Sequence, residues 1–182
     1  ALEDLPFKID TIVDSCAADG RLADGLLSAL NGHQELVSSP PSVIKFDMDP
    51  LSSDVEKMDA LDSCEKLQER LKGRRVVVLC NPPFDGNTNK ICKECFNLEG
   101  AVVCGFVLPG RHYLDFEGVE QLLPSFWVPV VHKPMDRRKF CQPHRAVDRG
   151  DELTVVILVA VRKNYARSVL APFTYQPKIF TI

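Results

Sequence analysis

The residues best suited to chemistry form one short segment that follows an apolar run. The run is Val-Val-Val-Leu-Cys at 76–80, and the segment is Asn81-Pro82-Pro83-Phe84. The run predicts a buried strand, and the prolines end it because they cannot donate backbone hydrogen bonds. Each proline fixes its own φ and pushes the preceding residue away from the helical region. The sequence therefore predicts a stiff, extended corner at the carboxyl end of a strand, where ligands bind in open α/β sheets.

This segment, here called the Pro-Pro corner (residues 81–84), has the groups needed to hold a planar amino group. The side-chain carbonyl of Asn81 accepts a hydrogen bond, and the backbone carbonyl of Pro82 is a second acceptor with few N–H partners nearby. Phe84 can stack on the ring that carries the amino group, which is worth about 1–3 kcal/mol for a nucleic-acid base. The alternative is a plain strand-to-loop turn with no ligand.

The Pro-Pro corner resembles the Asn/Asp-Pro-Pro-aromatic motif of S-adenosylmethionine-dependent amino-methyltransferases. Those enzymes methylate adenine at its exocyclic nitrogen, guanine at its exocyclic amine, or a glutamine side chain. The resemblance implies direct methyl transfer in which Asn81, Pro82, Pro83 and Phe84 position and polarise the acceptor. It favours N6 of adenine in RNA or DNA, where a base in a duplex must flip out. Protein glutamine and guanine N2 are the alternative substrates.

A strand predicted over 8–14 precedes small residues and a helix with leucines at helical spacing. The segment is similar to the family's cofactor motif, an acid followed by Gly-x-Gly. Asp14 takes the place of the acid, Gly20 that of the last glycine, and Ala18 replaces the first. Because alanine disfavours positive φ, we expect a right-handed conformation at Ala18. The resemblance implies that Asp14 lies near the methionine amino group, with the backbone of Cys16, Ala17 and Ala18 against the cofactor.

A second strand, predicted over 43–46 after a loop at 38–42, ends in Asp47-Met48-Asp49-Pro50. A carboxylate at the end of the second strand can accept from both ribose hydroxyls of a nucleoside. The segment looks like the acid-x-acid-Pro version found in adenine-type enzymes. By that match Asp47 binds the ribose and Met48 packs on the cofactor's adenine. Asp49 is the alternative ribose ligand or the N-cap of a helix.

The remaining pattern predicts an α/β fold with a Rossmann-like methyltransferase sheet. Helices are expected within 51–74 and over 90–98 and 116–123, and strands over 101–108, 126–131 and 153–161. Pro129 places the strand at 126–131 at an edge or a bulge. The sheet should be mostly parallel with a C-terminal antiparallel hairpin. The family that the chain resembles has a third strand between the second strand and the Pro-Pro corner, and this strand ends in an acid that contacts the cofactor's adenine. Because 51–74 holds no apolar strand, we expect this edge strand to be missing, with Asp59 or Asp62 in place of the acid or as exposed helix residues.

Two groups of residues are candidates for contact with the substrate. His112 and Tyr113 follow a predicted strand and could line the substrate pocket. Arg137, Arg138 and Lys139 belong to the densest positive stretch of the chain and could hold phosphates. A solvated loop, balanced by neighbouring aspartates, is the alternative for this stretch.

Two pairs of residues have the spacing of zinc ligands, Cys92-x-x-Cys95 and Cys141-x-x-His144. Together they would complete a four-ligand site. Against this, Cys92 and Cys95 share one face of a predicted helix, where cysteine packs as a small hydrophobic residue. We therefore predict no metal.

The 182 residues suffice for one domain, so we assign 1–182 to a single methyltransferase-like unit whose abrupt start suggests excision from a longer chain. The net charge of −3 does not indicate nucleic acid, so such contact must come from a local patch or a partner subunit.

Seven cysteines without framework spacing predict a reducing compartment, cytoplasm or nucleus. No apolar run reaches the roughly 20 residues of a membrane span. The rival hypothesis is a non-catalytic methyltransferase-like scaffold.

Overall fold

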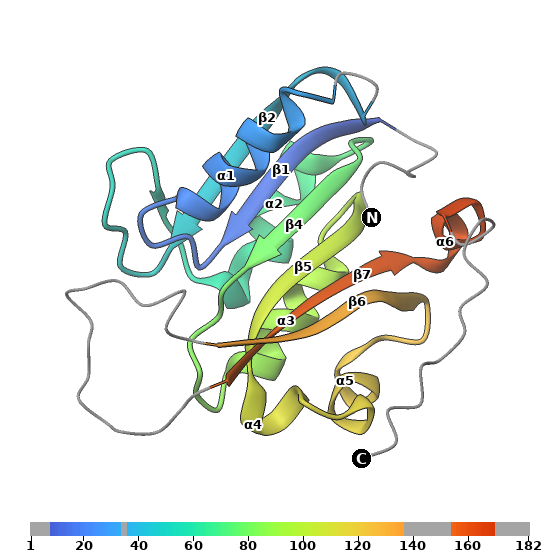
Figure 1. The fold of residues 1–182 in the computed structure, drawn as a ribbon. Coiled ribbons are helices and arrows are strands. Elements are labelled where there is room, and N and C mark those ends of the chain that lie inside the picture. The colour runs from blue at the N-terminus through green and yellow to red at the C-terminus, as the bar shows by residue number, and fades with distance from the viewer. Residues whose placement is uncertain (1–7, 34–35, 137–153, 170–182) are drawn as a thin grey trace.

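The computed structural model describes residues 8–33, 36–136 and 154–169, which form one seven-stranded sheet flanked by helices (Figure 1). The strands are β1 (Ile9–Ser15), β2 (Val37–Asp47), β3 (Glu56–Lys57), β4 (Val76–Cys80), β5 (Ala101–Pro109), β6 (Trp127–Asp136) and β7 (Thr154–Arg162). Their order across the sheet is β3-β2-β1-β4-β5-β7-β6. The neighbours from β3 to β5 pair in parallel, and β7 pairs antiparallel with β5 and β6. The predicted α/β fold with an antiparallel C-terminal pair is confirmed.

The central strands are those with continuous apolar runs. Every residue of β5 except Gly105 is buried, and β7 lies between β5 and β6. Strands that are buried on both faces have continuous apolar runs instead of alternating polar and apolar residues. The apolar runs in the sequence therefore predicted these strands. β6 lies at the edge of the sheet, and its register with β7 shifts between Pro129 and Val131. Proline is tolerated at both kinds of position, as predicted.

Helices cover the two faces of the sheet unequally. They are α1 (Arg21–Leu30), η2 (Ala60–Asp62, a 3-10 turn), α2 (Ser63–Leu71), α3 (Thr88–Asn97), α4 (Gly110–Tyr113), α5 (Phe116–Leu122) and α6 (Lys163–Val169). In Figure 1, α1 lies in front of the sheet, and α2 and α3 lie behind it. The larger core forms on the α2–α3 side, where the ring of Phe96 lies 5.0 Å from Phe106 and 4.9 Å from Trp127. No helix in the described part of the chain is long and apolar enough to span a bilayer.

The expected loop at 38–42 is instead part of β2, so that prediction was wrong. β2 starts at Val37, and its register with β1 shifts between the pairs Ile9–Val37 and Thr11–Ser42. On its other side, β2 pairs with β3 only at Phe46 and Asp47. Residues 38–42 therefore lie on an open edge, where prolines interrupt no ladder.

The expectation of a missing edge strand was also wrong. β3 pairs in parallel with the end of β2, and Met58 N–H donates to the Asp47 carbonyl at 3.0 Å. Both residues of β3 are exposed and charged, so the strand has no apolar pattern to detect. The helix expected from residue 51 does not form, because 51–55 make turns and bends and helical structure begins at Ala60.

Candidate functional site

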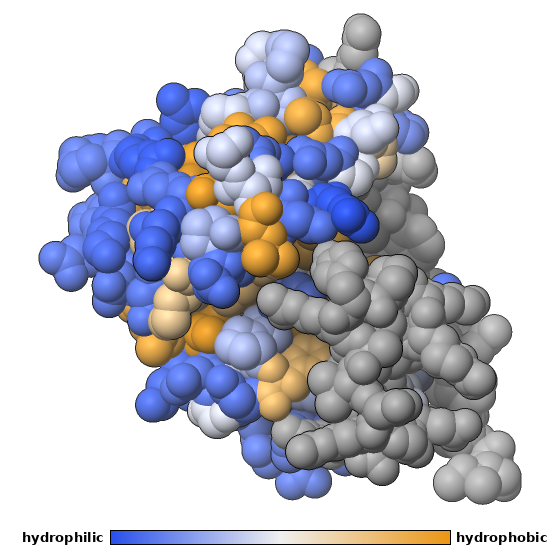
Figure 2. All heavy atoms as spheres, turned by 90° about the vertical axis from the view of Figure 1, so that its left-hand side faces the viewer, coloured by the Kyte–Doolittle hydropathy of each residue, from blue (hydrophilic) through white to orange (hydrophobic). Residues whose placement is uncertain are grey.

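A cavity of about 730 Å³ lies where β1, β2 and β4 end. This edge of the sheet is largely hydrophilic, with a few apolar side chains exposed among polar ones (Figure 2). The strand order reverses between β1 and β4, which is the point where open α/β sheets bind ligands. The volume falls within the roughly 300–1,000 Å³ of small-molecule sites. Among the predicted residues its lining includes Cys16, Ala18, Asp47, Met48, Asp49, Asn81, Pro82, Pro83 and Phe84.

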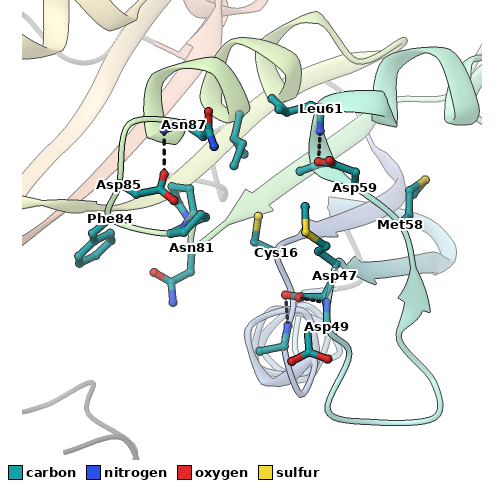
Figure 3. A pocket seen from close by; sticks show the side chains of 16 residues that line it. Cys16, Asp47, Asp49, Met58, Asp59, Leu61, Asn81, Phe84, Asp85 and Asn87 are labelled. Carbon is teal, nitrogen blue, oxygen red and sulfur yellow. Dashed lines mark hydrogen bonds between the residues drawn. The ribbon is translucent and has the colours of Figure 1, made fainter. Parts of the chain in front are cut away.

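The Pro-Pro corner forms one wall of this cavity. In Figure 3 the side chains of Asn81 and Phe84 lie together on one side, and Asp47 and Asp49 lie across from them. The hydroxyl of Thr88, the first residue of α3, donates to the carbonyls of Pro83 at 2.6 Å and Asp85 at 2.9 Å. The Pro83 carbonyl is therefore already engaged by a side chain, and the acceptor predicted for the amine is the Pro82 carbonyl. These contacts attach the corner to α3 and hold Asn81 and Phe84 in place.

The loop after β1 contains three residues with left-handed conformations. φ is 61° at Cys16, 51° at Ala18 and 79° at Gly20, so our right-handed prediction for Ala18 was wrong. The three positions are spaced two apart after Asp14, which is a backbone that glycine adopts at least cost. At Gly20 the left-handed φ favours glycine, and an added Cβ would lie 2.8 Å from the end of the Lys45 side chain, which would have to move.

Hydrogen bonds from the end of β2 hold the strained loop. Ala17 N–H donates to the Phe46 carbonyl at 3.0 Å, and Ala18 N–H donates to Asp47 Oδ2 at 2.9 Å. Asp47 Oδ1 accepts from Asp49 N–H at 2.8 Å. Each carboxylate oxygen has two lone pairs, so Asp47 can still accept from a ligand. Asp47 thus orders the loop and also faces the cavity.

Ala18→Gly should stabilise the protein. A left-handed L-residue costs about 1–2 kcal/mol, and glycine loses about 0.5–1 kcal/mol through chain entropy. We expect a net gain of about 0.5–1 kcal/mol, seen as a rise of about 1–4 °C in Tm. Ala17→Gly is the matched control, because Ala17 lies in the same loop without positive φ and should only lose stability. Equal losses in both variants would contradict strain at Ala18.

Asp14 lies beneath the loop, and it is absent from the lining of the cavity, as are Ala17 and Gly20. Its side chain is 1% exposed, and Oδ2 accepts from Ala23 N–H in the first turn of α1 at 2.9 Å. Oδ1 is buried without a hydrogen-bond partner among the described residues. Burial raises the pKa of Asp14 to about 6. Asp14 therefore anchors the start of α1 and retains one oxygen for a further donor.

Asp14→Asn should stabilise the protein more at high pH than at low pH. Because burial raises the Asp14 pKa to about 6, the folded state holds the proton more tightly than the unfolded state. The wild type therefore loses stability as the pH rises from about 4 to above 6. The variant does not titrate there, so we expect its Tm to exceed that of wild type by about 2–8 °C at about pH 8 and far less at about pH 4. Thermal unfolding followed by circular dichroism measures both, and equal shifts would refute the assignment.

The cavity is strongly acidic. Asp59 N-caps η2 by accepting from Leu61 N–H at 2.9 Å, and it joins Asp47, Asp49 and Asp85 in the lining. No lysine or arginine is among the described lining residues. Sequence reasoning missed Met58 and Leu61 here, because they follow a strand that has no apolar signal. Asp62 is different: it points to solvent and pairs with Lys66 at 3.0 Å.

His112 and Tyr113 line a neighbouring cavity of about 310 Å³. Phe84 and Asp85 line both cavities, so the predicted stacking ring lies at their boundary. Tyr113 is buried, which raises the pKa of its hydroxyl to about 12, and that hydroxyl pairs with Asn89. His112 and Tyr113 thus share a cavity with Phe84, and their contact with substrate stays a prediction.

The other predicted site residues lie elsewhere. Cys92 and Cys95 are buried in the core on α3, and burial raises the pKa of the Cys92 thiol. The described residues contain no cluster of three or more metal-ligating side chains. Outside the described residues lie Arg137, Arg138, Lys139, Cys141 and His144.

No model of a known protein family matches this sequence, and no curated protein sequence matches it. Among solved structures, the chain is similar to a 16S rRNA (adenine(1408)-N(1))-methyltransferase from Catenulisporales acidiphilia, at 12% identity over 85% of this chain and 88% of that one, with a TM-score of 0.49. A putative RNA methyltransferase from Pyrococcus horikoshii is similar at 16% identity over 86% and 74%, with a TM-score of 0.44. A putative methyltransferase from Thermoplasma acidophilum is similar at 20% identity over 87% of this chain and 70% of that one, with a TM-score of 0.44. These likenesses concern the fold.

Proposed function

We propose that this chain is an S-adenosylmethionine-dependent methyltransferase that acts on an exocyclic amino group, with N6 of adenine in RNA or DNA as the favoured target. One observation carries the proposal: a single cavity joins the Pro-Pro corner to Asp47 and to the loop after β1. The corner offers acceptors for an amine, and Asp47 offers acceptors for a ribose. These are the two groups that a transfer from a nucleoside-linked methyl donor to an amine brings together.

The charge of the cavity fits this cofactor. S-adenosylmethionine carries a sulfonium and an ammonium against one carboxylate, so it is a net cation. Four aspartates line the cavity, and no basic side chain does among the described lining residues. This field attracts a cation and repels nucleotide cofactors that carry phosphates. The buried, unpartnered Oδ1 of Asp14 also fits a nearby ammonium group, as the resemblance implies.

The chain's own residues position the acceptor. When bound, S-adenosylmethionine would supply a methyl group activated by its sulfonium charge. The Asn81 side-chain oxygen and the Pro82 carbonyl accept the two hydrogens of the target amine, which leaves its lone pair directed out of that plane. Phe84 stacks on the attached ring. Because the corner is held by Thr88, little conformational freedom is lost when the amine binds.

The substrate is the finer part of the proposal. Protein glutamine and guanine N2 present a similar planar amine and remain the alternatives. Contact of Arg137, Arg138 and Lys139 with phosphates, a partner subunit for target recognition, and a cytoplasmic or nuclear location stay predictions. The second candidate is the non-catalytic methyltransferase-like scaffold. It is favoured by the side chain of Cys16 and the methyl group of Ala18, because glycine at these positions would leave most room for a cofactor.

Isothermal titration calorimetry distinguishes the two candidates. We expect the reduced protein to bind S-adenosylmethionine and to show no binding of ATP, which has a similar nucleoside but opposite charge. Transfer of labelled methyl groups to separate RNA, DNA and protein pools then identifies the substrate class. If S-adenosylmethionine does not bind, the methyltransferase hypothesis is rejected and the non-catalytic scaffold is favoured.

A further inference from the structure

One cysteine in the loop after β1 and one at the end of the neighbouring strand β4 lie beside the cavity. Ser15 at the end of β1 lies opposite Cys80 at the end of β4, and Cys16 is the next residue of the chain. Cys16 is half-buried and lines the cavity, whereas Cys80 is fully buried behind it. Cys16 also packs against the core cluster that contains Cys80. A partly accessible thiol therefore lies beside a buried one.

The surroundings make Cys16 the more reactive of the two. The neighbouring Cys80 thiol lowers the pKa of Cys16, although burial opposes it. Burial raises the pKa of Cys80 well above its ordinary value. Cys64, also half-buried, has a pKa raised to about 12 by burial, and its thiol donates to the Glu94 carbonyl at 3.2 Å. Cys16 is thus the nucleophile, and Cys80 is positioned to react with the oxidised form of Cys16.

We propose that Cys16 and Cys80 are a peroxide-sensitive thiol pair that closes into an intramolecular disulfide at the cavity wall. The Cys16 thiolate attacks one oxygen of a hydroperoxide, the O–O bond breaks, and hydroxide leaves, which gives a sulfenic acid. The Cys80 thiol then attacks the Cys16 sulfur, the S–O bond breaks, and water leaves as the S–S bond forms. In total, two thiols and one hydrogen peroxide give one disulfide and two waters.

The disulfide ties the loop after β1 to the end of β4. That loop contacts Asp47 through Ala18, so the link also fixes the side of the cavity assigned to the cofactor. A consequence that rests on the proposed function is that oxidation weakens the binding of S-adenosylmethionine at least tenfold. Reduction with dithiothreitol restores it.

Alkylation tests the reactivity of Cys16. Trypsin places Cys16, Cys80 and Cys64 in separate peptides, residues 9–21, 76–90 and 58–66, each with one cysteine. The pKa of Cys16 is lowered and that of Cys64 is raised to about 12, so a larger fraction of Cys16 is thiolate near neutral pH. We therefore expect iodoacetamide to label Cys16 at least about tenfold faster than Cys64 near neutral pH. Equal rates would overturn the proposal.

Peroxide treatment tests the pairing. Non-reducing digestion should yield a linked species of peptides 9–21 and 76–90 in the wild type and in the control Cys64→Ala. Cys80→Ala should give no link and should accumulate Cys16 sulfenic acid that dimedone traps. The wild-type crosslink needs no variant, so misfolding of Cys80→Ala cannot mimic the result. An unmodified Cys16, or a link from 76–90 to the Cys95 peptide instead, would overturn the proposal.

Binding measurements separate this inference from the proposed function. If the crosslink forms but the reduced protein does not bind S-adenosylmethionine, the thiol pair stands and the methyltransferase does not. If the reduced protein binds it and no crosslink forms, the methyltransferase stands and the thiol pair is rejected.

Discussion

Asn81→Ala is expected to lower kcat/KM for methyl transfer by about 10²–10³-fold, the usual effect of removing one aligned hydrogen-bonding group at a reacting centre. The side chain of Asn81 is exposed and lines the cavity opposite Asp47, so its removal leaves the core unchanged. Affinity for S-adenosylmethionine should stay within about twofold, because Asn81 acts on the amine. Single-turnover rates with the accepted substrate, together with calorimetry, separate the two effects.

Two further variants control this experiment. Asn97→Ala removes the same exposed side chain from the far end of α3 and should keep the wild-type rate. Asn81→Asp keeps an acceptor oxygen at the same place and should retain part of the activity. Similar rates for wild type and Asn81→Ala would remove the assigned role of Asn81, whatever the cofactor affinity.

Asp47→Ala should have the largest effect on binding, with a loss of about 10²-fold or more in affinity for S-adenosylmethionine. Hydrogen bonds to a charged acceptor are worth about 1.5–3 kcal/mol each, and the ribose would lose two. The variant should also lose about 1–3 kcal/mol of folding stability, because Ala18 N–H loses its partner in a strained loop. Calorimetry and thermal unfolding measure the two losses separately.

Asp47→Asn distinguishes a ligand contact from a structural one. It keeps an oxygen for the part-buried Ala18 N–H and loses only the acceptor for the exposed Asp49 N–H, so stability should fall less than in Asp47→Ala while affinity still falls. Asp62→Asn is the control, because Asp62 is exposed, pairs with Lys66 and lies outside the cavity lining. If affinity and stability fall together in every variant, Asp47 only supports the loop.

The parts of the site that could be predicted depend on local chemistry. An apolar run stopped by two prolines defines β4 and its corner without help from the rest of the chain. A carboxylate directly after a strand, as at Asp47, must lie at the edge where other parallel strands end. The cavity accordingly contains Asn81, Phe84, Asp47 and Met48 together.

The parts that could not be predicted depend on distant contacts. Ala18 is left-handed because its N–H is held by a carboxylate 29 residues away, which no local preference reveals. β3 forms because the end of β2 offers unpaired backbone groups, although its own side chains are charged. Asp14 points beneath the loop, where Ala23 N–H binds one of its oxygens, and no local pattern in the sequence reveals this contact.

Phe84 belongs to the walls of both cavities, and this links their occupancy. A molecule in either one restricts the rotamers that the ring can adopt toward the other. By thermodynamic reciprocity, donor and acceptor must then change each other's dissociation constants by the same factor. Double-reciprocal initial-rate plots should therefore intersect away from the horizontal axis, and Phe84→Leu should move the intersection toward that axis, as for independent binding.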